Sequence, residues 1–116
     1  MKVKHTDEKG KGVFAKKYYA KGKLIMRHEI LVIPPNQASK IGKTFLNNYM
    51  FFMSKVYFIA LGLGSLLNHS AHPNLDYIFQ KRTRQIEFYT LCKVKKGEEL
   101  TIDYEWESYP WERILL

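Results

Sequence analysis

Short apolar runs separated by glycine, proline and charged residues dominate the hydrophobic pattern of this chain. In the first half they occupy residues 13–15, 24–26, 30–33 and 57–61. Each run is short, partly β-branched and bounded by turn-forming residues, which is typical of strands. Pro34 and Pro35 have to end the strand predicted at residues 30–33.

The second half continues this pattern. Runs at residues 75–80 and 85–91 flank the polar stretch 81–84 and predict a β-hairpin. In the second arm apolar and polar side chains alternate, as on a strand with two different faces. A turn at residues 94–98 then leads into a short final strand at residues 100–102.

Helical spacing is confined to the middle of the chain. Apolar and aromatic residues between positions 45 and 53 recur at intervals that fit a helix. Residues 63–68, after Gly62, predict one further helical turn. The pattern as a whole predicts a mainly β fold of many short strands and few short helices, in one domain spanning residues 1–116.

Composition fits such a domain. The chain has 116 residues, of which 46% are hydrophobic and 26% charged. Its one cysteine, Cys92, excludes an internal disulfide framework and a zinc site built from cysteine clusters. No apolar stretch approaches the roughly 18 residues of a membrane span, and the N-terminus lacks the apolar core of a signal peptide. We therefore expect an intracellular protein, in the cytoplasm or in its own or a host nucleus, with no membrane partner.

The charge is strongly positive. Lys and Arg number 19 against 11 Asp and Glu, a net charge of +8, and they gather in the N-terminal quarter and at residues 81–84. Such a surface is either a solvated basic face or a site of attraction to nucleic acid or nucleoprotein. Charge by itself leaves both interpretations open.

Two glycine patterns resemble nucleotide-binding motifs only superficially. Gly10, Gly12 and Ala15 have the spacing of the dinucleotide fingerprint, but the segment before them is polar-leaning where that motif needs a hydrophobic strand. Gly62 and Gly64 have no third glycine at the required position and no following Gly-Lys-Ser/Thr, which excludes a P-loop.

Two histidine patterns are equally weak. His69 and His72 have no acidic or cysteine partner at metal-ligand spacing, so no metal site is expected. A nucleophilic pair of Cys92 with a histidine rests on nothing beyond the two residue types.

Three segments taken together are much more specific. In chain order they are Gly10-Lys11-Gly12-Val13-Phe14-Ala15 with Gly22, Leu66-Leu67-Asn68-His69-Ser70 with Pro73-Asn74, and Gly97-Glu98-Glu99-Leu100-Thr101-Ile102-Asp103-Tyr104. In this order they resemble the SET domain family of protein-lysine methyltransferases. The resemblance extends over residues 10–104 and is nearest to the minimal stand-alone SET proteins of viruses and bacteria.

The resemblance implies a fold and a cofactor. It implies a SET fold of several small sheets whose C-terminal segment is threaded under a loop, like a pseudoknot, without the flanking Cys-rich zinc segments. It implies that S-adenosylmethionine binds between the glycine segment and the Asn-His-Ser segment, where Lys11, Gly12, Asn68 and His69 would hold it. Glycine allows a backbone to approach a ligand closely. Tyr49 is a candidate for the edge shared by cofactor and substrate channel.

The resemblance also assigns the reaction. Tyr104 would lie beside the cofactor methyl as the catalytic residue and a further cofactor contact, while Tyr77 and Trp106 would line the channel of the substrate lysine. A free lysine has a pKa of about 10.4 and is almost wholly charged near neutral pH. An apolar channel beside a sulfonium favours the neutral amine, which leaves alignment as the main task of the protein.

Several alternatives stay open. Asn68 could cap a loop, and Tyr49, Trp106 and Tyr104 could simply pack in the core. The substrate is a histone or another basic protein, and nucleic acid could neutralise the repulsion between it and the basic enzyme. The apolar residues 114–116 would suit a homodimer interface if exposed, or pack back onto their own domain. The rival function is a catalytically inactive SET-like module that binds a peptide or nucleic acid.

Overall fold

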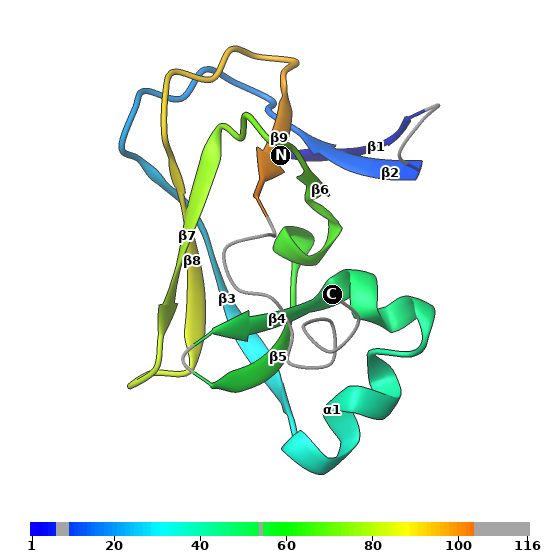
Figure 1. The fold of residues 1–116 in the computed structure, drawn as a ribbon. Helices are drawn as coiled ribbons and strands as arrows, with labels where there is room; N and C mark the ends of the chain where they lie inside the picture. The colour runs from blue at the N-terminus through cyan, green and yellow to red at the C-terminus, as the bar shows by residue number, and fades with distance from the viewer. Residues whose placement is uncertain (7–9, 54, 104–116) are drawn as a thin grey trace.

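The structure of the chain, a computed structural model, describes residues 1–6, 10–53 and 55–103. Within this part nine strands form two sheets, with one short α-helix and two 3-10 helices between them (Figure 1). The strands are β1 (Lys2–Thr6), β2 (Gly10–Phe14), β3 (Leu24–Ile33), β4 (Met50–Met53), β5 (Val56–Ala60), β6 (Asn68–His69), β7 (Leu75–Gln80), β8 (Gln85–Thr90) and β9 (Glu99–Ile102). The helices are α1 (Pro35–Ile41), η1 (Phe45–Tyr49) and η2 (Leu63–Leu66). The prediction of a mainly β fold with few short helices is confirmed.

The five-stranded sheet is built on the long strand β3. Its order is β4-β5-β3-β8-β7, and each neighbouring pair is antiparallel. The first part of β3 pairs with β8 and its last four residues pair with β5. The two separate runs predicted at residues 24–26 and 30–33 are thus parts of one strand. They look separate in the sequence because Arg27 and Glu29 are polar and point to solvent, while His28 between them is half-buried. The hairpin predicted for β7 and β8 is confirmed.

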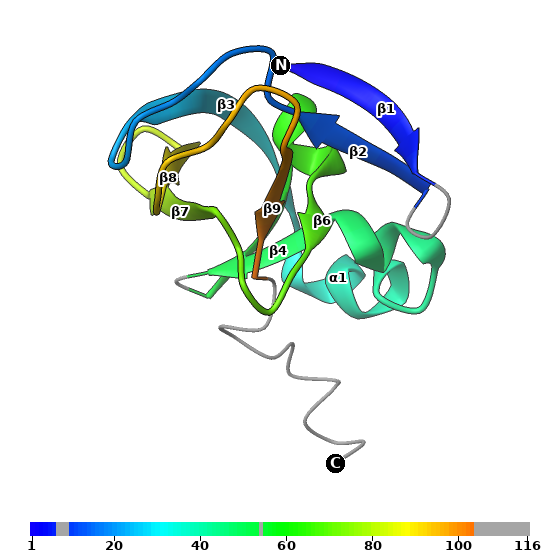
Figure 2. The same cartoon turned by 90° about the horizontal axis from the view of Figure 1, so that it is seen from above.

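The four-stranded sheet brings the three motif segments together. Its order is β1-β2-β9-β6. β9 pairs with β2 in antiparallel fashion, with Val13 opposite Leu100, and with β6 in parallel, with Asn68 opposite Thr101. Figure 2 shows β9 running beside β6. The third motif is therefore inserted between the first two, while the predicted threading of the tail concerns residues outside the described part of the chain.

One hydrophobic cluster joins the two sheets. Val13, Leu100 and Ile102 of the four-stranded sheet and Phe58 and Phe88 of the other are all 0% exposed and belong to the same cluster. Full burial of a side chain of this size stabilises a fold by roughly 1.5–3 kcal/mol. The core thus fixes the position of β9, and with it the third motif, against the larger sheet.

Two segments differ from the predictions. Helical spacing is confirmed at Phe45–Tyr49 but wrong for Met50–Met53, which forms β4. Tertiary pairing explains this, because β4 pairs with β5 and Phe52 stacks on Tyr57 at 4.5 Å between ring centroids. β1 was not predicted, because its sequence is polar. It lies at the edge of its sheet and pairs with β2.

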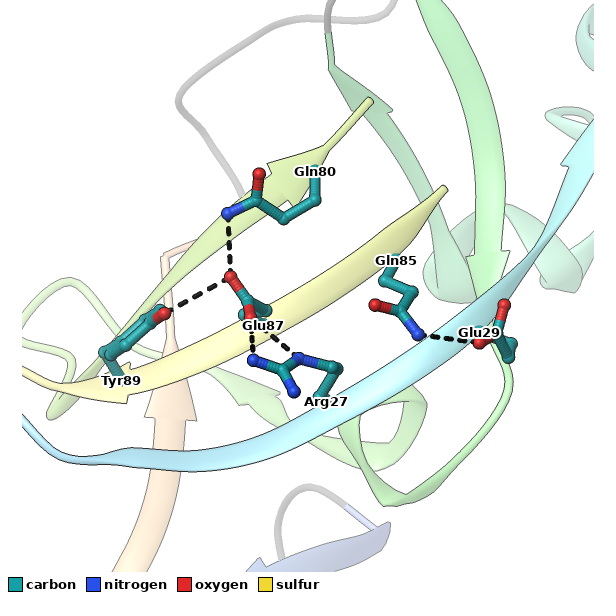
Figure 3. Close-up of polar contacts among 6 residues, drawn as sticks. All are labelled: Arg27, Glu29, Gln80, Gln85, Glu87 and Tyr89. Atoms are coloured by element: carbon teal, nitrogen blue, oxygen red, sulfur yellow. Dashed lines mark hydrogen bonds and ion pairs between the residues drawn. The ribbon is translucent and has the colours of Figure 1, made fainter. Parts of the chain in front are cut away.

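The outward face of the larger sheet carries a buried carboxylate. Glu87 on β8 is 4% exposed, and Figure 3 shows it between β3 and β7. Its oxygens accept hydrogen bonds from Gln80 Nε2 at 2.8 Å, from Arg27 Nε at 2.7 Å and from the Tyr89 hydroxyl at 3.2 Å. The Gln80 and Arg27 bonds outweigh the opposing effect of burial and hold the pKa of Glu87 below its usual 4.5. This network clamps the three strands together.

We predict that Glu87→Gln lowers the melting temperature at neutral pH by several degrees. A carboxylate with a lowered pKa stabilises the fold above its unfolded-state pKa, and this stabilisation disappears as the pH falls through the folded-state value. The gap between wild type and variant should therefore narrow below about pH 4.5, as measured by thermal unfolding monitored by circular dichroism. Glu29→Gln is the matched control, since Glu29 on the same face is exposed and accepts one bond from Gln85. Equal losses in both variants would contradict the role of Glu87.

Candidate active site

The side chain of Asn68 is the point where the three motifs meet. Asn68 follows η2 and begins β6. Its Nδ2 donates one hydrogen bond to the backbone carbonyl of Lys11 at 3.0 Å and another to Glu99 Oε2 at 2.7 Å. Lys11 belongs to the glycine segment on β2, and Glu99 begins β9. One amide group therefore ties the glycine segment, the Asn-His-Ser segment and the Gly-Glu-Glu segment together.

Gly12 is where the backbone comes closest to this junction. A Cβ atom at Gly12 would lie 2.5 Å from Glu99 Oε2 and 3.0 Å from Asn68 Nδ2. Real Cβ atoms do not tolerate the shorter distance, so any larger residue would have to displace the Glu99 carboxylate. The absence of a side chain at this position allows Asn68 and Glu99 to sit directly on the strand.

Asn74 fixes the strand that carries Glu99. Its Nδ2 donates to the carbonyl of Glu99 at 2.8 Å, and its Oδ1 accepts from the Thr101 amide at 2.9 Å. The Ser70 amide adds a bond to the Ile102 carbonyl at 2.9 Å. The Pro-Asn part of the second motif therefore holds the third motif in register, a role that the sequence did not indicate.

His69 is the last residue of β6 in the same sheet. Its Nδ1 is 3.7 Å from Asp103 Oδ1, and the two side chains are 40% and 32% exposed. When His69 is protonated this contact is an ion pair. His69 is opposite Ile102 in the parallel pairing, so β6 and β9 end next to each other.

The two described aromatic candidates lie on other elements. Tyr77 on β7 is 6% exposed and packs edge-on against Phe51 with ring centroids 5.3 Å apart. Tyr49 ends η1 and packs edge-on against Phe45 at 5.9 Å. The structure thus brings Lys11, Gly12, Asn68 and Glu99 together, while the two tyrosines come from η1 and β7. Tyr104 and Trp106 lie outside the described residues.

His28 supports η2, the helix that leads to Asn68. Its Nε2 accepts a hydrogen bond from the Gly64 amide at 3.0 Å, and a Cβ at Gly62 or Gly64 would lie within 3.0 Å of its ring. Burial lowers the pKa of His28 below its usual 6.5, against a smaller opposite effect of a backbone hydrogen bond at Arg27. The neutral ring that accepts this bond is thereby favoured. No sequence signal marks His28, because its partner is 36 residues away.

The groups described at this site are backbone amides, backbone carbonyls and polar side chains, which recognise their partners through hydrogen bonds. Among residues 1–6, 10–53 and 55–103, no group of three or more His, Cys, Asp or Glu side chains is placed to hold a metal ion. Cys92 is free and exposed. Nor is any described helix long and apolar enough to cross a membrane.

Comparison with known protein families gives a match to the SET domain over residues 10–105. The chain belongs to the SET domain family. The resemblance inferred from the three motifs is thereby confirmed at the level of the family, whose methyltransferases use S-adenosylmethionine.

Two individual proteins support this membership. A Schizosaccharomyces pombe histone-lysine N-methyltransferase, H3 lysine-37 specific, is 35% identical to this SET protein over 106 residues, which cover 90% of this chain and 72% of that one. The crystal structure of a candidate histone methyltransferase of Plasmodium falciparum superposes with a TM-score of 0.71 at 20% identity, covering 95% of each chain. The second likeness concerns the fold alone and confirms the predicted SET architecture of small sheets.

Proposed function

We propose that this SET protein transfers a methyl group from S-adenosylmethionine to lysine side chains of a protein, with histones as the substrate class. The observation that carries the proposal is the junction at Asn68, which joins all three motifs through one amide. Family membership and the histone specificity named for the fission yeast relative support the reaction and the substrate class.

The residues at the junction fit a cofactor of this kind. The buried Gly12 lets the side chains of Asn68 and Glu99 lie directly against β2, where a Cβ would collide with them. The exposed Lys11 and the half-exposed His69 flank this position on β2 and β6. We propose that Lys11, Gly12, Asn68 and His69 bind the cofactor, that Tyr49 contributes at its edge, and that Tyr104 contacts it from the third motif.

S-adenosylmethionine supplies an electrophilic methyl group on a positive sulfonium. The chain then has to bring a lysine amine in its neutral form and hold it in line with the methyl–sulfur bond. Tyr77 and Trp106, as walls of an apolar channel, would remove water from the amine and lower its pKa from about 10.4. The Tyr104 hydroxyl would orient the amine, and such alignment can contribute several kcal/mol to the rate.

The test is methyl transfer by the wild-type chain. Labelled S-adenosylmethionine is incubated with the protein and core histones, or with a whole-cell lysate, and label on lysine is measured. Label on a histone supports the whole proposal, whereas label confined to another basic protein overturns the histone part. Calorimetric titration separates the remaining cases, because folded protein that neither binds the cofactor nor transfers label would be the inactive module.

We predict that Asn68→Ala weakens S-adenosylmethionine binding by about 10- to 100-fold. The substitution removes a side chain that we propose contacts the cofactor, together with both bonds that hold Lys11 and Glu99 in place. The loss of hydrogen bonds at a partly buried site costs about 1–3 kcal/mol. The dissociation constant from isothermal titration calorimetry checks this. Asn36→Ala is the control, since Asn36 is exposed on α1. An unchanged constant in Asn68→Ala would remove this residue from the cofactor site.

Further features remain predictions. A histone substrate would place the protein at chromatin, and therefore in a nucleus. The minimal viral or bacterial type, a single domain over residues 1–116 and a homodimer through residues 114–116 are expectations from the sequence, and the last of these concerns residues outside the described part.

A further inference from the structure

Two loops far apart in the sequence lie side by side at one end of the molecule. Residues 15–23 connect β2 to β3, and residues 91–98 connect β8 to β9 (Figures 1 and 2). Tyr19 and Val94 exchange two backbone hydrogen bonds of 2.9 Å. The Gly97 amide donates to the Ala15 carbonyl at 2.8 Å at one end of this contact. We call the two loops together the lysine ridge.

The lysine ridge carries a dense and unbalanced positive charge. Its exposed lysines are Lys16, Lys17, Lys21, Lys23, Lys93, Lys95 and Lys96. The first loop contains no Asp or Glu, and the second contains one, Glu98. Glu98 accepts a hydrogen bond from the backbone amide of Lys95. Within the described part of the chain, none of these lysines forms an ion pair, so their charge is available to an anionic partner.

The ridge is held on a firm base. Val94 is 0% exposed and belongs to the central core. The Thr90 hydroxyl, 3% exposed, donates to the Ala20 carbonyl at 2.6 Å and accepts from the Lys23 amide at 2.8 Å. These bonds tie the loop that carries four of the lysines to the end of β8. The positive charges therefore project from a fixed surface, which reduces the loss of conformational freedom on binding.

We infer that the lysine ridge binds the phosphate backbone of duplex DNA. Lysine is a point charge suited to phosphates, and contacts of this kind do not depend on base sequence. Single-stranded nucleic acid is the less fitting partner, because it needs exposed aromatic rings for stacking. Tyr18, 55% exposed, is the one large exposed aromatic residue that the described structure places on the ridge.

This inference rests on the proposed function and specifies which surface would hold the enzyme near its substrate. The chain has a net charge of +8, and its proposed substrate is also basic, so the two repel each other in free solution. DNA bound to the histone is negatively charged and would replace this repulsion by attraction. The ridge would then hold the enzyme on the nucleosome, while the junction at Asn68, on separate elements, remains open to the cofactor.

Fluorescence anisotropy with a labelled duplex of about 20 base pairs tests the inference. About four phosphate contacts give a measurable dependence of the binding constant on salt concentration. The ridge variant replaces Lys16, Lys17, Lys95 and Lys96 by Gln. The control replaces Lys40, Lys43, Lys81 and Arg82, which are exposed elsewhere, by Gln and has the same net charge. We expect the ridge variant to lose at least tenfold in affinity, with the slope of log K against log salt falling by about 3. We expect a loss of less than threefold in the control.

Equal losses in the two variants would overturn the inference, because net charge would then explain the binding. Tighter binding of wild type to single-stranded DNA, to duplex RNA or to vesicles of anionic phospholipid than to duplex DNA would also overturn it.

A second assay separates this inference from the proposed function. The ridge variant should methylate free core histones at the wild-type rate and nucleosomes at least tenfold more slowly, with unchanged cofactor affinity. Ridge-dependent DNA binding by a wild-type protein that methylates no histone would contradict the proposed function and leave the ridge intact. Equal rates of the ridge variant and wild type on nucleosomes would overturn the link between the two.

Discussion

Replacing Tyr104 by Phe is expected to lower kcat for methyl transfer by about 100-fold and to leave S-adenosylmethionine affinity within about threefold of wild type. Only the hydroxyl group is lost. A group that orients the lysine amine acts mainly in the transition state, so its removal lowers kcat more than it weakens binding. The assay is transfer of labelled methyl to core histones at saturating cofactor, with the dissociation constant measured separately by calorimetry.

The local structure makes Tyr104 the natural candidate. β9 ends at Ile102, which lies opposite His69 of the second motif, and Asp103 then contacts the His69 ring. The residue that follows Asp103 in the sequence is Tyr104. Within the described residues, the third motif therefore runs beside the second motif up to the contact between Asp103 and His69.

Tyr18→Phe is the matched control for this prediction. It removes the same hydroxyl group from an exposed tyrosine on the lysine ridge. Activity on free histones should not change in this control. If Tyr104→Phe retained more than half of the wild-type kcat, the tyrosine hydroxyl would have no part in the reaction.

The second large effect is expected at Gly64, in the helix that precedes Asn68. A Cβ at this position would lie 2.4 Å from Phe88 Cε2 and 3.0 Å from His28 Cδ2. Phe88 is 0% exposed in the centre of the core and cannot move aside without displacing its neighbours. We therefore expect Gly64→Ala to destabilise the fold by about 1–3 kcal/mol and to lower the melting temperature by roughly 5–15 °C.

This substitution should also disturb the cofactor site. The Gly64 amide donates to His28 Nε2, and η2 leads through Leu67 into Asn68. Displacement of η2 would move Asn68 away from Lys11 and Glu99. Thermal unfolding measures the first effect and cofactor titration the second.

Ser65→Ala is the neighbouring control for Gly64→Ala. Ser65 lies in the same helix, and its hydroxyl bonds only to the Gly62 carbonyl among the hydrogen bonds described for it. Its loss should change the melting temperature by a few degrees at most. A Gly64→Ala protein as stable as wild type would show that the contact with Phe88 relaxes more easily than the geometry indicates.

Local sequence was sufficient for the elements whose own residues decide their conformation. The hairpin of β7 and β8 follows from alternating side chains on either side of a polar turn, and Pro34 and Pro35 end β3 as expected. The segment Met50–Met53 was not predictable in this way, because its apolar spacing fits a helix and a strand alike. Pairing with β5 and stacking of Phe52 on Tyr57 decide between them.

The candidate site divides along the same line. The amino-acid sequence by itself indicated the family and the cofactor class and predicted Gly12, Asn68 and His69 as site residues, because three specific motifs occur in the family's order. Only the tertiary structure decided that Glu99 and Asn74 hold the motifs together and that His28 supports η2. It also decided that the lysines of residues 15–23 and 91–98 form one surface. Each of these contacts joins residues that are distant along the chain, and strand pairing and a shared core determine which distant residues meet.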